Sequence, residues 1–136
     1  MVAQRGKIEG YSSIFLFVWY NDFGDSMTEE MEILEYILNY FGIESQLEKL
    51  TEEAIEVFKA GIIYETSETP KEIVKRGQRN AIVEEIVDLS IVLDQIRLKY
   101  DIDIDEEEYW RKQKLQRTKQ RINEGYYEKD RARFKK

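Results

Sequence analysis

The feature that most constrains this chain is a segment, residues 81–96, that is apolar in nearly every direction of a helix yet carries two acids. Isoleucine, valine and leucine fill most of its positions, so the helix is expected to be central and buried on several sides. Glu85 and Asp88 are three residues apart and point the same way, in line with Ala81 and Val92. Since burying unpaired carboxylates is costly, this stripe predicts a positively charged partner for them.

A second acidic group lies upstream, in a segment that also has helical spacing. Glu53 and Glu56 share one helix face, and Glu52 stands beside them. If the two helices pack antiparallel, these acids converge with Glu85 and Asp88. Converged carboxylates repel one another and lose hydration, so such a cluster requires a cation. The alternative is two solvated acidic faces, since single acidic pairs at this spacing are common on wet helices.

The chain contains no cysteine and no histidine, which excludes many kinds of site. Thiolate zinc sites, cysteine nucleophiles, Ser-His-Asp triads and histidine-bearing zinc or di-iron motifs are all impossible. A metal site built from these side chains must use mostly oxygen ligands, which select hard cations. We therefore expect Mg²⁺, with Mn²⁺ as the alternative.

Composition and helical spacing predict a single all-α domain in this chain of 136 residues. The pattern indicates four helices, over about residues 28–40, 44–60, 70–100 and 105–123, with a connector at 62–69. Gly42, Gly61 and Gly125 are expected to end three of these helices, and Gly77 marks a candidate break in the third. Asp103 is expected to cap the fourth. A core of this size favours completion by oligomerisation.

Residues 1–26 differ from the rest of the chain. The apolar run at 14–20 has seven residues, far fewer than the roughly 20 that span a bilayer. No small-residue cleavage site of a signal peptide follows it. We therefore expect a cytoplasmic protein with no membrane partner. Residues 1–26 are read either as an N-terminal extension that packs on a partner subunit or as a mistranslated leader before a start at Met27.

Charge is distributed unevenly around a net value of −7. Residues 109–136 carry 11 Lys/Arg against 3 Asp/Glu, whereas residues 1–108 carry 10 against 25. We assign the helical domain to residues 27–125 and a basic tail to residues 126–136. The basic region could hold phosphates at the acidic body's metal, bind nucleic acid, or be a solvated helix face with a frayed end. Nucleic acid is the least favoured partner because no nucleic-acid-binding motif is present.

The two acidic motifs together resemble those of a known family. Glu-Glu-x-x-Glu at 52–56, followed by Glu-x-x-Asp at 85–88 on the next helix, is similar to the MazG-type nucleoside triphosphate pyrophosphohydrolases of the all-α NTP pyrophosphatase superfamily. The 28 residues between the motifs are at the long end of the family's pattern. The basic run at 112–121 is also similar to the family's fourth-helix segment. The resemblance covers about residues 28–123.

The resemblance implies a four-helix bundle core of the MazG-like type, assembled as a homodimer or homotetramer. It also implies Mg²⁺-dependent hydrolysis of an NTP or dNTP to the monophosphate and pyrophosphate, as in house-cleaning of nucleotide pools. By motif position, the metal ligands would be Glu53, Glu56, Glu85 and Asp88. Glu52 would be an accessory acid that supports the ligands or orients the water, so Glu52 and Glu53 are the candidate catalytic residues.

Positive side chains for the phosphates are available on the fourth helix, where they could line one face or simply be solvated. These candidates are Lys112, Lys114, Arg117 and Arg121. The base-binding residues stay unassigned, since Tyr109 and Trp110 could stack on a base or fill the core. The alternative to an enzyme is a non-catalytic MazG-like helical module that regulates or binds nucleotides.

Overall fold

The computed structural model describes residues 26–68 and 71–134, and these residues form five α-helices. In chain order the helices are α2 (Ser26–Phe41), α3 (Ile43–Thr66), α4 (Glu72–Lys99), α5 (Ile104–Asn123) and α6 (Glu128–Phe134). The all-α prediction is confirmed for this part of the chain. The expectations for residues 1–25 lie outside the described residues.

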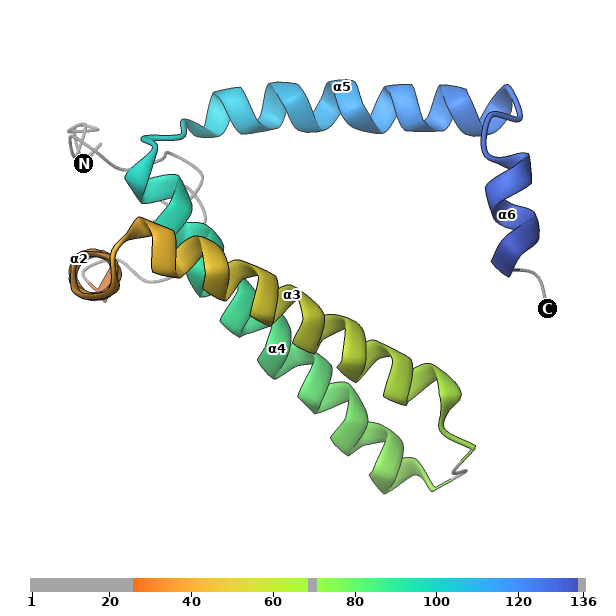
Figure 1. Cartoon of the computed structure of the whole chain (residues 1–136), viewed down its shortest axis with the longest axis horizontal. Helices are drawn as coiled ribbons and strands as arrows, with labels where there is room; N and C mark the ends of the chain where they lie inside the picture. Colours follow the sequence, from red (N-terminus) through yellow and green to blue (C-terminus); the bar gives the residue numbers. More distant parts are fainter. Residues whose placement is uncertain (1–25, 69–70, 135–136) are drawn as a thin grey trace, which may run out of the picture.

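The core of the fold is an antiparallel hairpin of α3 and α4, which run side by side (Figure 1). α2 crosses the end of this hairpin where α3 begins and α4 ends. Met31, Leu34 and Leu38 of α2 are buried, as is Val92 of α4. Burial of each such side chain contributes roughly 1.5–3 kcal/mol, so this apolar stripe fixes α2 across the hairpin.

The glycines that follow α2 and α5 behave as predicted. Gly42 and Gly125 have positive φ values of 81° and 74°, a conformation that glycine adopts without a steric penalty. α2 therefore ends at Phe41, and α5 ends at Asn123. Both boundaries confirm the sequence prediction.

α3 is longer than predicted, and the prediction that Gly61 ends it is wrong. The helix continues to Thr66 and takes up most of the expected connector at 62–69. A glycine inside a helix costs only about 1 kcal/mol relative to alanine, and tertiary contacts can offset that. Here the ammonium group of Lys75 on α4 donates to the Tyr64 carbonyl and lies 4.3 Å from the centre of the Tyr64 ring.

α4 is one continuous helix, without the break considered at Gly77. It begins at Glu72, after Lys71 in an extended conformation. The helix start expected at Pro70 lies outside the described residues. Among the helices that the structure describes, none is both long and apolar enough to cross a membrane.

A tight turn redirects the chain from α4 into α5. The Ile102 amide donates to the Arg97 carbonyl at 3.1 Å, and Asp101 takes a positive φ of 48°, as at many helix C-termini. Asp103 then caps α5, because its carboxylate accepts from the Asp105 amide at 2.8 Å. The predicted cap is confirmed.

α5 does not pack into a bundle within one chain. It runs away from the α3–α4 hairpin (Figure 1), and none of its side chains is buried. Tyr109 and Trp110 are 58% and 53% exposed, so neither fills the core. Among the helices that the structure describes, α2, α3 and α4 thus pack together, and α5 does not join them.

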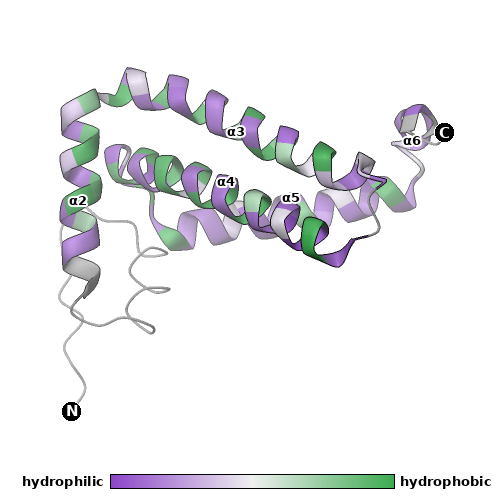
Figure 2. Cartoon of the chain, turned by 90° about the horizontal axis from the view of Figure 1, so that it is seen from below, coloured by the Kyte–Doolittle hydropathy of each residue, from purple (hydrophilic) through white to green (hydrophobic). Residues whose placement is uncertain are grey.

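The expectation that residues 81–96 are buried on several sides is wrong for a single chain. Of the apolar residues of α4, only Val92 is buried. Hydrophobic positions recur along α2, α3 and α4 in Figure 2, and four large side chains of this segment are 38–49% exposed. These are Val83, Ile86, Val87 and Ile91. We call this group the α4 apolar face; the described residues leave it partly exposed.

Candidate metal centre

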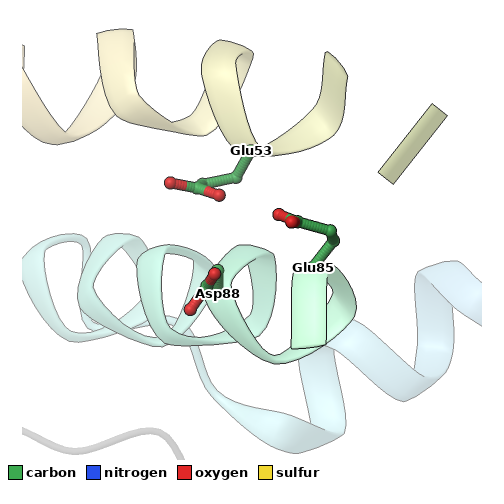
Figure 3. Close-up of side chains that lie close together, drawn as sticks. All are labelled: Glu53, Glu85 and Asp88. Carbon is green, nitrogen blue, oxygen red and sulfur yellow. The ribbon is translucent and has the colours of Figure 1, made fainter. Parts of the chain in front are cut away.

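Three acidic side chains meet between α3 and α4. Glu53 comes from α3, whereas Glu85 and Asp88 come from α4, and their carboxylates face the gap between the two helices (Figure 3). One oxygen of each lies within 4.8 Å of the others. Ligands on opposite sides of Mg²⁺ are about 4.2 Å apart, so these oxygens would share one such cation after a small movement of the side chains. We call Glu53, Glu85 and Asp88 the acidic triad.

The triad forms because polar residues interrupt the stripe along which α3 and α4 meet. On α3 the buried residues are Gln46, Glu53 and Ala60, spaced by seven residues and therefore on one helix face. On α4, Gln95 is buried seven residues after Asp88. Along the contact between the two helices, the small Ala60 is thus followed by the acids Glu53 and Asp88 and then by the amides Gln46 and Gln95.

Lys49 provides the cation nearest to the triad. Its Nζ lies 2.8 Å from Oε1 of the buried Glu53 and 3.2 Å from Oε2 of the exposed Glu52. Hydrogen bonds to Glu53 and then Glu52 raise the pKa of Lys49 to about 12, so it stays protonated. Among the described residues no ion pair reaches Glu85 or Asp88.

The surroundings of Glu85 disfavour its ionised form. Its pKa is raised first by lost hydration and then by repulsion from Asp88, Glu56 and Glu53. A raised carboxyl pKa means that the surroundings disfavour the ionised form. A divalent cation placed among these oxygens would reverse that effect.

Glu52 and Glu56 lie at the edge of the triad and not within it. Glu56 is exposed and pairs with Lys59 at 3.0 Å, although it is near enough to raise the pKa of Glu85. Glu52 is exposed and pairs with Lys49. The structure therefore brings together three of the four predicted ligands, and the roles of Glu52 and Glu56 stay predictions.

A cleft of about 460 Å³ opens beside the triad, bounded by α2, α3 and α4. Glu53 and Asp88 line it, and so do Lys49 and the buried amides of Gln46 and Gln95. Its apolar walls come from Ile37, Phe41, Ile91 and Val92. A volume of this size suits a ligand as large as a nucleotide.

The predicted phosphate-binding residues lie apart from the triad within one chain. Lys112, Lys114, Arg117 and Arg121 all belong to α5. None of them is among the residues that line the cleft beside the triad. Lys114 instead lines an open hollow of about 530 Å³ with Trp110, and the Arg121 guanidinium lies 5.0 Å from the centre of the Tyr126 ring. Their phosphate-binding role stays a prediction.

α4 carries a second group of carboxylates that is built differently. Arg97 Nη1 donates to Asp94 at 3.0 Å, and Arg97 Nε and Nη2 bind both oxygens of Glu107 at 2.9 and 3.0 Å. Burial raises the pKa of Asp94 to about 6, although Arg97 opposes this rise. We call Asp94, Arg97 and Glu107 the arginine cluster; it ties the end of α4 to the start of α5.

Lys49, Gln46 and Gln95 are site residues that sequence reasoning missed. Lys49 precedes Glu53 by four residues, a spacing that brings the two side chains together on a helix. Gln46 precedes Glu53 by seven residues, which places it on the same stripe. Extending the acidic stripes in both directions would have found all three.

Comparisons with protein-family models, with curated proteins and with solved structures found no match. The resemblance to the MazG-type pyrophosphohydrolases therefore rests on sequence motifs at 52–56 and 85–88, of which the structure brings Glu53, Glu85 and Asp88 together.

Proposed function

We propose that this chain hydrolyses a nucleoside triphosphate, NTP or dNTP, to the monophosphate and pyrophosphate with the aid of Mg²⁺ or Mn²⁺. The observation that carries the proposal is the acidic triad beside a cleft of nucleotide size. A triphosphate and three carboxylates repel one another, so a substrate at this site needs bridging divalent cations.

The donor set suits such a cation, because the triad offers only carboxylate oxygens. Glu53, Glu85 and Asp88 would hold the metal, and Glu56 lies one turn from Glu53 as the remaining predicted ligand. Once bound, the cation would supply Lewis-acid polarisation of the attacked phosphorus and a lower pKa for the attacking water.

The other residues at the cleft have roles that follow from their charge. Glu52 is exposed there and would orient the water or accept its proton, since the chain has no histidine to act as a base. Lys49 stays protonated beside Glu53. If Glu53 were bound to a divalent cation, the ammonium group of Lys49 would be free to stabilise the negative charge on the leaving pyrophosphate.

We further propose that the active form is a homodimer or homotetramer. Two observations support this: the α4 apolar face is exposed, and α5 has no buried side chain. A second copy that covers this face could also bring the cations of its α5 toward the triad.

Sedimentation tests the assembly. Val87→Lys should weaken association about 100-fold, because two apolar side chains are lost from a symmetric interface. Unchanged association would contradict this use of α4, and Ile73→Lys, at the exposed start of the helix, is the control.

Pyrophosphate release from a panel of NTPs and dNTPs, with and without Mg²⁺, tests the proposed reaction. We expect metal-dependent release by the wild-type chain and its loss in Glu85→Gln. Glu84→Gln is the matched control, because Glu84 is an exposed neighbour outside the triad. Absence of turnover across the panel in a folded wild-type chain would instead favour the non-catalytic helical module that binds or regulates nucleotides.

A further inference from the structure

Gln95 is the most deeply buried polar residue of the described chain, with 1% of its surface exposed. Its Nε2 donates to the Ile91 carbonyl at 3.3 Å. Its Oε1 is buried and has no hydrogen-bond partner among the residues that the structure describes. A buried acceptor without a partner is destabilising, and where its residue lines a cleft, a ligand there can supply the missing donor.

The position of Gln95 connects this acceptor with the metal centre. Gln95 lines the same cleft as Asp88 and follows it by seven residues, which is two helical turns on one face and about 10 Å along α4. Gln46, the buried amide of α3, lines the cleft as well. A sugar between a phosphate group and a base spans a separation of this order.

We propose that this cleft binds the nucleobase of the substrate and that Gln95 Oε1 accepts a hydrogen bond from an N–H group on the edge of the base. The inference rests on the proposed function, for which it supplies the base-recognition residues. Gln46 contributes a second amide to the same edge. Phe41, Ile91 and Val92 provide apolar walls for the faces of a planar ring.

The orientation of the amide determines which group it recognises. Because Nε2 is held by the Ile91 carbonyl, the atom left for the ligand is an acceptor. The site therefore selects bases that present an N–H group and rejects analogues that lack it. Sites that hydrogen-bond a substrate N–H discriminate strongly, because the unmatched polar group stays buried and unpaired.

The test uses pairs of triphosphates in which one member lacks a hydrogen-bond donor of the base. ATP is compared with purine-riboside triphosphate and CTP with the pyrimidin-2-one riboside triphosphate, which both lack the amino group, and UTP with 3-methyluridine triphosphate, which lacks the N3–H. We expect kcat/KM of the wild-type chain to differ about 100-fold or more within at least one pair. Gln95→Met should reduce that ratio to about 3-fold or less, and Gln46→Met should reduce it partly. Gln78→Met is the matched control, since Gln78 Oε1 is also buried without a described partner but does not line the cleft.

The outcomes separate this inference from the proposed function. Turnover with no discrimination in any pair, or discrimination that Gln95→Met preserves, overturns the base-recognition role and leaves the hydrolase intact. A ratio between ribo and deoxyribo substrates that Gln95→Met removes would assign the acceptor to a sugar hydroxyl and overturn the inference as well. A wild-type chain that hydrolyses none of the triphosphates overturns the proposed function, and the inference falls with it.

Discussion

α4 takes part in two groups of carboxylates, and only one of them has a cation of its own. In the arginine cluster, one half-buried guanidinium binds both oxygens of Glu107 and one of Asp94. In the acidic triad, Lys49 reaches Glu53 only and is shared with Glu52. Of the three carboxylates of the triad, Lys49 thus contacts one.

The difference separates a structural contact from a candidate site. A guanidinium in the middle of its acids gives a closed cluster, which pairs both carboxylates with one cation and connects α4 to α5. In the triad, no cation among the described residues pairs with Glu85 or Asp88, and the triad borders a cleft.

Removing one carboxylate from each group should affect hydrolysis very differently. Asp88→Asn deletes a proposed metal ligand, so we expect kcat/KM for the preferred triphosphate to fall about 1,000-fold, or about 4 kcal/mol of transition-state stabilisation. Asp94→Asn should change it by about 3-fold or less. Pyrophosphate release is the measurement, and equal losses in the two variants would remove the distinction between the clusters.

Removing the cation from each group should affect folding in the opposite order. Arg97→Met leaves two partly buried carboxylates unpaired, so the free energy of unfolding should fall by about 3 kcal/mol. Lys49→Met removes a largely exposed partner and should cost about 1 kcal/mol or less. Urea unfolding in the absence of metal measures both, and a Lys49 variant as damaged as the Arg97 variant would contradict the account.

Mg²⁺ should stabilise the fold through the triad alone. At about 100 times its dissociation constant, a ligand of the folded state raises the free energy of unfolding by about 2.7 kcal/mol. Glu53→Gln should abolish this gain in thermal unfolding experiments, whereas Asp94→Asn should keep it. Stabilisation that persists in Glu53→Gln would place the metal elsewhere.

The arginine cluster should give the smallest effect, a dependence of stability on pH. The folded pKa of Asp94, about 6, exceeds the ordinary value of 3.8, so the folded state binds this proton more tightly than the unfolded chain does. The free energy of unfolding should therefore fall as pH rises from about 4 to about 6 and level off above that. The contribution is on the order of 1 kcal/mol after solvent screening. Asp94→Asn should flatten this slope in metal-free urea titrations; an unchanged slope would assign it to other groups.

Local sequence signals predicted the helices and the meeting of the acids well. Spacing put Glu53 on one helix face and Glu85 with Asp88 on another, since residues three apart share a face. Their meeting was predicted on the condition that the two helices pack antiparallel, and the α3–α4 hairpin meets that condition. Gly42, Gly125 and Asp103 marked real boundaries because their conformations or hydrogen bonds are local. The prediction that Gly61 ends α3 was wrong, because packing of the last turns of α3 along α4 is not a local property.

What the sequence could not predict is which partner each charged or apolar face meets. The α4 apolar face looks central by composition, but the part of the chain that the structure describes leaves it partly exposed. The cations of α5 have the spacing of a phosphate-binding face, but the helix runs away from the triad. Arg97 and Lys49 are both basic residues one turn from acids, and only the tertiary structure distinguishes a closed cluster from an open one.

The central claim is that Glu53, Glu85 and Asp88 together hold a divalent cation. Titration of the full chain with Mn²⁺, followed by the loss of the free-ion signal in electron paramagnetic resonance, tests it most directly. We predict bound Mn²⁺ that Mg²⁺ displaces, retention of binding in Asp94→Asn, and loss of binding in Asp88→Asn. Equal Mn²⁺ binding by wild type and Asp88→Asn, or none by the folded wild-type chain, would contradict the account.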